Sequence, residues 1–320
     1  MDRMTSLRVF REVVEAGSFV AAAERLGMSP PMASKHVAQL EKSLGARLLH
    51  RSSRHQSLTE AGTAWYEQSR RALDLLDAAE AAIGQTHDMP RGQLKVSAPV
   101  WCATARFARV LADYRERFPE VLVDMHLENR KVDLAADGYD LALRATQEPS
   151  PALIARPLCR VPFYLAGTPA YIQRMGGLPA LPADLAKLGA IVPSYVNLEN
   201  LALKGPGGRM FPLRLAPAMR SDDTTLTLHA VHADMGIAFM PLWLIDEDIA
   251  RGRLLRLLPE FESTPVTLFA VYTSRQYMSP KLRTFIDFLS ERLKVPHERP
   301  LSAPPRGATR VRHHGDLPPP

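Results

Sequence analysis

Apolar residues recur at helical intervals through the first part of the chain and predict three short helices. Leu7, Phe10 and Val14 support the first, over residues 4–16, which Gly17 ends. The second follows Ser18, a good N-cap, and ends at Gly27. The third begins after Ser29, with two prolines in the first turn, where a missing N–H loses no helical hydrogen bond.

The third helix, up to Leu44, has one apolar side. Ala33, Val37, Leu40 and Leu44 are spaced four, three and four apart. Pro31, Lys35, Ala38 and Lys42 fall on the opposite side, with Ser34 on the flank. Such a helix could enter a DNA major groove, or it could belong to an ordinary helical hairpin with a solvated basic face. These residues alone leave both interpretations open.

Two short extended pieces follow, Leu48–Arg51 and Gln56–Thr59, around the turn-prone pair Ser52 and Ser53. They predict a small basic hairpin, or wing, whose arginines would contact the DNA backbone or the minor groove. Residues 29–59 hold five Lys and Arg against one acid, a net charge of +4, whereas residues 60–89 carry a net −4. This positive segment suits phosphate contact.

After Thr59, a helix of about 25 residues is predicted, with a seam of spacings of four and three typical of a dimerising helix. Its members are Trp65, Ser69, Ala72, Leu76, Ala79 and Ile83. The stretch from Gly84 to Gly92 is the predicted break before the next domain.

Strand and helix signals alternate from Gln93 onward and indicate an α/β domain with parallel sheets. The predicted strands are 94–99, 121–127, 140–144, 161–166, 190–195, 236–240 and 266–272. The predicted helices are 103–117, 132–138, 168–175, one capped by Ser221 or Asp222, 242–250 and 280–293. Residues 295–320, rich in proline and slightly basic, are expected to be disordered.

Composition narrows the class of protein. With 320 residues, 46% of them hydrophobic, and a net charge of +6, the chain can fold into two or three globular domains and mildly favours an anionic partner. No apolar run could cross a bilayer and no signal-peptide core is visible, so a cytoplasmic location is expected. The two cysteines cannot form a disulfide framework.

Residues 5–62 resemble the winged helix-turn-helix of LysR-type transcriptional regulators. The matching residues are Phe10, Ser18, Phe19, Ala22, Ala23, Leu26, Ser29, Ser34, Leu40, Glu41, Leu44, Gly45, Leu48, Arg51, Leu58, Thr59, Ala61 and Gly62. The family often has Gln at position 30, where this chain has Pro30, so base reading is expected from Ser34, Lys35 and His36 instead. The full set of expected DNA contacts is Ser18, Ser29, Pro30, Pro31, Ser34, Lys35, His36, Lys42, Arg51 and Arg54.

The resemblance implies a division of the chain. Residues 1–59 would bind DNA, 60–89 would form the dimerising linker helix, and 93–294 would form an effector-binding domain similar to periplasmic solute-binding proteins. That domain would have two α/β subdomains, 93–162 with 267–294 and 163–266, joined by crossing strands near 162–166 and 266–272. Homodimers or homotetramers would form through the linker helix and the effector domains.

In such folds a ligand lies where strands end and helices begin, between the subdomains. The residues selected by this rule are Ser97, Val100, Trp101, Cys102, Arg144, Thr146, Ser194, Tyr195, Ser221, Thr224 and Phe239. Arg144 and free N–H groups near Thr224 suit a carboxylate, and the aromatic residues suit a ring. Trp101 and Phe239 could equally be core residues, and Arg144 could instead pair with Asp140 or Glu148.

Few other residues suggest a redox or metal site. Cys102, near a predicted helix start, could sense oxidants, but Cys159 is distant in sequence and a redox role is not favoured. His229 and His232 lack the further ligands of a metal site, and no cofactor is expected. The leading hypothesis is a sequence-specific regulator of transcription, without enzymatic activity, that responds to a small organic anion. The alternatives are an enzyme or transport-binding protein on the same α/β domain, and a structural nucleoid-type DNA protein.

Overall fold

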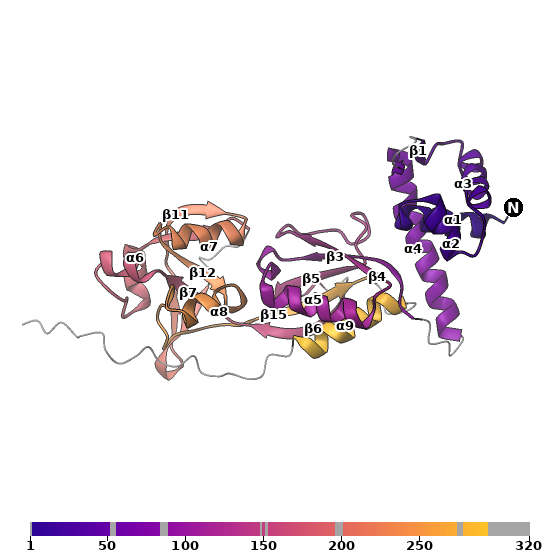
Figure 1. The fold of residues 1–320 in the computed structure, drawn as a ribbon. Coiled ribbons are helices and arrows are strands. Elements are labelled where there is room, and N and C mark those ends of the chain that lie inside the picture. The colour runs from indigo at the N-terminus through magenta and orange to yellow at the C-terminus, as the bar shows by residue number, and fades with distance from the viewer. Residues whose placement is uncertain are drawn as a thin grey trace, which may run out of the picture.

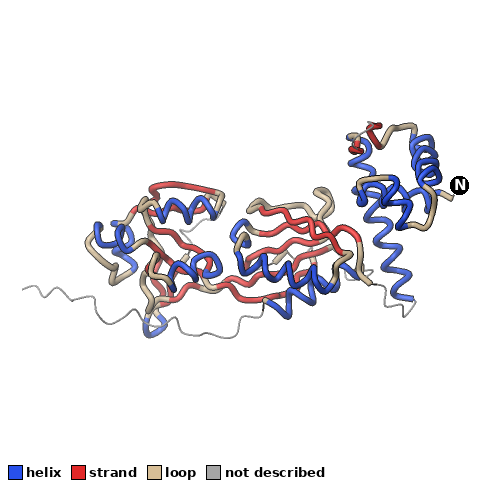
Figure 2. The backbone as a smooth tube through the Cα atoms, viewed as in Figure 1, coloured by secondary structure: helices blue, strands red, loops and turns tan. Residues whose placement is uncertain are grey.

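The computed structural model describes residues 2–51, 56–83, 89–147, 149–150, 153–195, 201–273 and 278–293. A helical head carries the N-terminus, and two α/β halves lie side by side (Figures 1 and 2). The predictions for Ser52, Ser53, Arg54 and Glu148, for the break at 84–88 and for the tail 295–320 fall outside the described residues.

The head contains the three predicted helices, α1 (Arg3–Ala16), α2 (Phe19–Arg25) and α3 (Pro30–Leu44). Gly17 and Gly45 end α1 and α3 in the left-handed conformation, which glycine adopts without steric strain. The Ser18 hydroxyl caps α2 by accepting the Ala21 N–H at 3.1 Å. These local signals therefore gave the correct helix boundaries within one or two residues.

The wing is a two-stranded antiparallel ribbon, β1 (Leu49–Arg51) and β2 (Gln56–Leu58), in which Leu49 faces Leu58. It leads directly into the long helix α4 (Glu60–Ile83), whose Gly62 N–H donates to the Thr59 hydroxyl at 2.9 Å. The core beneath the wing combines residues of α1, α2, α3 and α4. Its buried members are Val9, Phe10, Val13, Ala22, Ala23, Ala33, Val37, Leu40, Leu48, Leu49 and Tyr66.

The predicted seam of α4 is only partly available to a second chain. Ser69 is buried within the chain, and Trp65 packs against the head core. Ala72 and Leu76 of the predicted seam are exposed, and so is the neighbouring Leu75. The apolar face that could meet another copy therefore includes the middle of the predicted seam but not its amino end.

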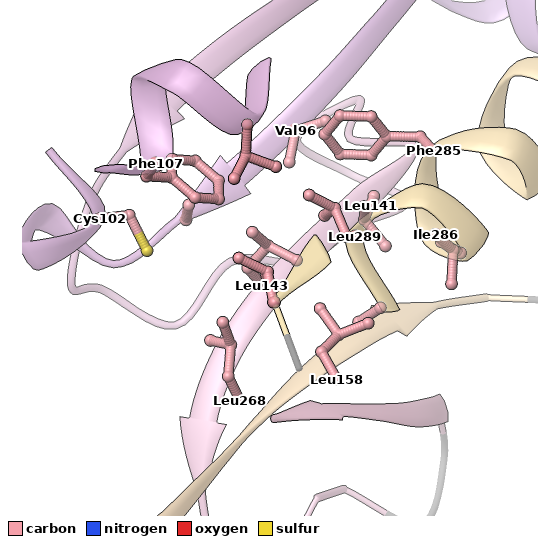
Figure 3. Close-up of a cluster of buried hydrophobic side chains, with 14 of the residues drawn as sticks. Val96, Cys102, Phe107, Leu141, Leu143, Leu158, Leu268, Phe285, Ile286 and Leu289 are labelled. Atoms are coloured by element: carbon pink, nitrogen blue, oxygen red, sulfur yellow. The ribbon is translucent and has the colours of Figure 1, made fainter. Parts of the chain in front are cut away.

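The first α/β half contains a five-stranded sheet in the order β4–β3–β5–β15–β6. Its strands are β3 (Gly92–Ala98), β4 (Val121–Leu127), β5 (Leu141–Thr146), β6 (Ile154–Val161) and β15 (Val266–Tyr272). Its helices are η1, a 3₁₀ turn (Val100–Cys102), α5 (Ala105–Arg117) and α9 (Pro280–Arg292). Phe107 of α5, Phe285 of α9 and leucines of the strands form the buried core (Figure 3).

The second half contains a sheet in the order β11–β8–β12–β7–β13. Its strands are β7 (Phe163–Gly167), β8 (Gly189–Pro193), β11 (Ala216–Ser221), β12 (Ile237–Pro241) and β13 (Leu255–Arg256). Its helices are α6 (Pro169–Arg174), η2 (Pro182–Lys187), α7 (Thr224–His232) and α8 (Leu242–Ala250). A small separate sheet contains β9 (Ala202–Lys204), β10 (Met210–Pro212) and β14 (Glu262–Ser263), with the turn η4 (Pro206–Gly208).

The chain passes between the halves twice. β6 ends at Val161 in the first sheet and β7 begins at Phe163 in the second, while β15 returns to the first sheet at Val266 (Figure 1). β15 runs antiparallel to β5 and β6, and β7 runs antiparallel to β12. The sheets are thus mixed, and the expectation of parallel sheets was wrong at these connecting strands.

Two local predictions were wrong, and one strand was not predicted. Residues 134–138 form a turn and no helix, because Asp133 caps only one turn and Gly138 then takes a φ of 78°. The N-cap of α7 is Asp223, whose carboxylate accepts the Thr225 and Leu226 N–H groups, whereas Ser221 bonds the backbone of Asp223. The strand that was not predicted is β6, because the expected extended region began only at residue 161.

A buried carboxylate of α8 bonds to α7. Asp248 Oδ2 lies 2.7 Å from His232 Nε2, and Asp248 Oδ1 accepts the Arg253 Nε–H at 2.6 Å. Burial raises the pKa of Asp248, but the bonds to His232 and Arg253 outweigh it and hold that pKa below its ordinary value of 3.8. This carboxylate therefore stabilises the fold above its unfolded pKa, and the contribution is lost as pH falls toward the folded pKa.

Replacing Asp248 with Asn should lower the free energy of unfolding by about 1–3 kcal/mol at neutral pH. Urea denaturation at neutral and at acid pH would show the difference from wild type shrink in acid. Glu247→Gln, which removes an exposed partner of Arg251, is the matched control and should change little. An equal loss for both variants, or a loss that grows in acid, would contradict the assignment.

Candidate functional site

Helix α3 presents its polar side to solvent while its apolar side is fixed in the head core. Ala33, Val37 and Leu40 are buried. The exposed residues of the helix and its N-cap include Ser29, Pro30, Pro31, Ser34, Lys35 and Lys42 from the predicted set. A helix held by one apolar stripe and exposing short polar and basic side chains can approach base edges without unfolding its own core.

His36 requires a correction. It was expected to contribute to base reading, but it is buried and its Nδ1 lies 3.0 Å from the Ser6 hydroxyl of α1. Position 36 is three residues from Ala33 and four from Leu40, so it falls beside the apolar stripe. Its imidazole connects α1 to α3 and does not belong to the exposed side of the helix.

The serines near the helix starts differ in role. The Ser18 hydroxyl is used as a helix cap, whereas Ser29 makes no side-chain capping bond. The reason is that Pro30 and Pro31 have no N–H, and the Met32 N–H already donates to the Ser29 carbonyl at 2.9 Å. Ser29 therefore exposes a hydroxyl that the helix does not use.

Sequence reasoning missed Met32 and Gln39, both exposed on α3. Gln39 lies four residues after Lys35, one turn along the same side, so helical spacing alone could have found it. A Gln amide can pair with adenine and a Met side chain can contact a thymine methyl. On the wing, Arg51 belongs to β1, opposite Gln56.

In the first α/β half, Ser97 and Arg144 meet at the carboxyl ends of β3 and β5. Arg144 Nη2 donates to the Ser97 hydroxyl at 2.7 Å, and Ser97 donates to Glu128 Oε1 at 3.0 Å. Asp140 does not pair with Arg144, because it is bound by Arg70. Among the described residues Arg144 has no ion pair, and burial lowers its pKa despite the nearby Glu128 charge.

Glu128 and Tyr139 were missed by sequence reasoning. The Tyr139 hydroxyl donates to Glu128 Oε1 at 2.7 Å, and Arg130 Nε lies 2.6 Å from Oε2. Burial raises the pKa of Glu128, but these bonds and that from Ser97 bring the pKa below its ordinary range. Glu128 follows β4 directly, so the strand-end rule applied to 121–127 could have identified it.

Asn129 connects the two halves. Its Oδ1 accepts the Val100 N–H of η1 at 3.3 Å, and its Nδ2 donates to the Asp222 carbonyl, just before α7, at 2.5 Å. Both α7 and α8 contact η1. The described structure therefore places the predicted residues Val100 and Thr224 on two sides of one junction.

Trp101 and Phe239 belong to an aromatic cluster at this junction. Trp101 is buried, with its ring 5.5 Å from that of Trp243 and 6.3 Å from that of Phe163, whose own ring lies 5.5 Å from Phe239. The core interpretation of Trp101 thus agrees with its burial, and Phe239 is half-buried. Trp243, at the start of α8, was missed.

Two buried hydrogen-bonding groups at the junction find no partner in the described part of the chain. Trp243 is 3% exposed and Thr224 is 7% exposed, and among the described residues neither Trp243 Nε1 nor Thr224 Oγ1 has a hydrogen-bond partner. The Thr224 hydroxyl is near enough to lower the pKa of the Tyr195 phenol, which burial raises overall, but the two do not meet hydrogen-bond geometry. Buried donors are normally satisfied, so an additional acceptor at this junction could bind either of them.

The other predicted residues are more dispersed. The Ser194 N–H donates to the Ser221 carbonyl at 2.9 Å, which places the ends of β8 and β11 together. Thr146 is half-buried at the end of β5. Cys102 is buried among the hydrophobic residues of the first half, and burial raises the pKa of its thiol, so it is not primed as a thiolate. Within the described residues, no cluster of His, Cys, Asp or Glu could hold a metal ion.

Two segments of the chain match known protein families. Residues 4–63 match the bacterial regulatory helix-turn-helix of the lysR family, and residues 87–294 match the LysR substrate binding domain. The chain is a LysR-type transcriptional regulator. In the described part of this regulator, no helix is both long and apolar enough to cross a membrane.

Relatives cover nearly the whole regulator. An HTH-type transcriptional regulator of Xanthomonas campestris pv. campestris is 33% identical over 314 residues, 96% of this chain and 90% of that protein. The HTH-type transcriptional activator AaeR of Escherichia coli is 31% identical, over 91% of this chain and 94% of its own. The solved structure of CrgA from Neisseria meningitidis has a TM-score of 0.58 at 30% identity, covering 90% of this chain and 98% of CrgA. Like its family, this regulator combines DNA binding with an effector-binding domain.

Proposed function

We propose that this regulator reads its operator with the exposed side of α3 and holds the DNA backbone with the wing. Ser34 and Lys35, with Met32 and Gln39, would face base edges, while Lys42, Arg51 and Arg54 would contact phosphates. Ser18, Ser29, Pro30 and Pro31 would line the approach of the DNA backbone to the helix start. The observation that carries this proposal is that Ser34, Lys35 and Lys42 are exposed while Ala33, Val37 and Leu40 of the apolar stripe are buried.

The test is a comparison of Lys35→Ala with wild type on operator DNA selected from a random pool and on random DNA. If Lys35 reads a base, specific binding should weaken by about 1–3 kcal/mol while binding to random DNA changes little. Lys187→Ala, which alters an exposed lysine in the second half, should change neither. Equal losses on both DNAs would show that Lys35 contacts only a phosphate. No selection of any operator would refute sequence-specific binding.

We also propose that the effector is a small organic carboxylate, bound at the junction between the two halves. Arg144 supplies a positive charge without a described acidic partner, and Trp243 Nε1 and Thr224 Oγ1 supply donors without acceptors. Tyr195, 45% exposed, would cover a ring or an aliphatic body. An anion would supply a counter-charge for Arg144 and an acceptor for either donor.

Isothermal titration with aromatic and aliphatic carboxylic acids tests the effector proposal. Trp243→Phe removes one donor while keeping an aromatic ring, and it should weaken binding of the best acid by about 5–10-fold, the loss of roughly one hydrogen bond. Binding confined to cations or sugars would refute the anionic class.

The proposed effector site would also explain regulation. A ligand that bonds to both halves favours their closed arrangement over an open one. In a dimer joined through Ala72, Leu75 and Leu76 of α4, this closure would change the spacing of the two DNA-binding heads. We infer that the chain acts by this binding linkage and not by catalysis.

A further inference from the structure

A buried arginine in the linker helix connects the DNA-binding head to the effector domain. Arg70, in the middle of α4, is 1% exposed. Its Nη1 lies 2.9 Å from Asp140 Oδ2 and donates to the Gln93 carbonyl at 3.1 Å, and its Nη2 donates to the Gly138 carbonyl at 3.4 Å. Every one of these partners belongs to the first α/β half.

The same helix binds that half at other points. Lys281 of α9 is buried and its Nζ lies 2.8 Å from Asp74. The Tyr66 hydroxyl donates to Gln93 Oε1 at 3.0 Å. A Cβ at Gly138, where φ is 78°, would overlap the Glu67 carboxylate, so helix and turn are in close contact. The docking of α4 is therefore continuous over more than two turns.

The network also extends into the head. Asp74 lies 3.6 Å from Arg11 Nη1, and Asp77 lies 2.7 Å from Arg8 Nη1, both arginines being on α1. Glu15, also on α1, accepts from the Tyr66 hydroxyl at 3.2 Å. Head, linker helix and first half thus share one set of partly buried charges.

Burial determines how strongly these contacts hold. A solvent-exposed ion pair contributes little, since water replaces each partner. Arg70 is enclosed, so moving α4 away from β5 would leave a charged group and backbone carbonyls without partners before water could enter. Separation of the two domains is for this reason a costly motion.

The contact also lies on the strands of the candidate effector site. Asp140 directly precedes β5 and also accepts the Lys95 N–H of β3 at 2.8 Å. β3 and β5 are neighbouring parallel strands, and their opposite ends carry Ser97 and Arg144. The linker helix is attached to the amino ends of the strands whose carboxyl ends carry these residues.

We propose that Arg70 is a positioning residue that fixes the head, α4 and the first half as one rigid body. The second half is then the moving part, and Arg70 sets the orientation at which each head is presented to DNA. The rigid-body statement is independent of the effector, whereas its consequence for operator spacing rests on the proposed function.

Spin-label distances in the full chain test the rigid body. Labels at Glu24→Cys of α2 and Glu116→Cys of α5, both exposed, report head against first half, with Cys102 and Cys159 replaced by Ala. An excess of unlabelled chain removes distances between copies. Wild type should give one narrow distribution, and Arg70→Met and Asp140→Asn should give distributions at least about twofold wider.

Arg156→Met is the matched control, because it removes an exposed arginine paired with Asp287 within the first half alone. It should leave the distribution narrow. Unchanged widths in both Arg70→Met and Asp140→Asn would overturn the proposal. If Arg70→Met fails to fold by circular dichroism, Asp140→Asn, which keeps the side-chain shape, decides the question.

Operator selection gives a readout that loss of stability would not produce. Wild type should select two half-sites at one spacing, and Arg70→Met should select the same half-site sequence at several spacings. Retention of the single spacing would count against a positioning role. If wild type itself selects no half-site, the proposed DNA reading fails, while the distance measurements still decide whether Arg70 fixes the head.

Discussion

Replacing Gly62 with alanine should lower the free energy of unfolding of the head by about 3 kcal/mol or more and abolish operator binding. Gly62 lies in the first turn of α4, and a Cβ there would overlap the carbonyl group of Leu48, which is backbone. Leu48 is buried in the head core and cannot move aside. The helix would have to separate from the wing that it supports.

Denaturation followed by circular dichroism, together with operator binding, measures this effect. Gly45→Ala is the matched control: it forces alanine into a φ of 66° but meets no atom within 4 Å. It should lose only the strain of a left-handed residue, about 1–2 kcal/mol. A Gly62→Ala variant no less stable than Gly45→Ala would show that the wing tolerates the displacement.

The second large effect is expected at Glu41, a buried acid of α3. Its Oε1 accepts the N–H groups of Leu48 and Leu49 at 2.8 and 3.2 Å and thereby fixes the chain entering the wing. Glu41→Ala would leave both groups buried without this acceptor. The free energy of unfolding should fall by about 2–5 kcal/mol, since each such group costs about 1–3 kcal/mol.

Glu41→Gln keeps a carbonyl oxygen at the same place and should lose less than half as much as Glu41→Ala. Urea denaturation of both variants provides the comparison, and operator affinity should fall in the same order because the wing loses its anchor. If Gln and Ala were equally destabilising, the charge of Glu41 would matter and not its hydrogen-bond acceptor.

Much of the head was predictable because its signals are local. Apolar spacing in α3 identified the buried side, and the same spacing identified Ser34, Lys35 and Lys42 as exposed. His36 was misplaced because a polar side chain at the edge of the stripe can point either way. The contact with Ser6, 30 residues earlier, decided its orientation.

The effector domain likewise has some site residues that the sequence could identify and others that it could not. Strand ends selected Ser97 and Arg144, which do meet, because carboxyl ends of parallel strands share one edge of a sheet. The aromatic cluster brings Trp101 to Trp243, and no spacing rule relates positions so far apart. Asn129 could be found only as a strand-end residue, with no sign of its bond to Asp222.

The sequence by itself determined the winged helix-turn-helix, its basic face and the α/β character of the remainder, since caps, turns and periodicity act over a few residues. Tertiary structure alone decided which side of α4 is free, that Arg144 is not the partner of Asp140, and that Arg70 is. Asp140 lies 70 residues from Arg70 and only four from Arg144. The choice between those arginines depends on which one the fold buries beside it, and burial is a property of the whole chain.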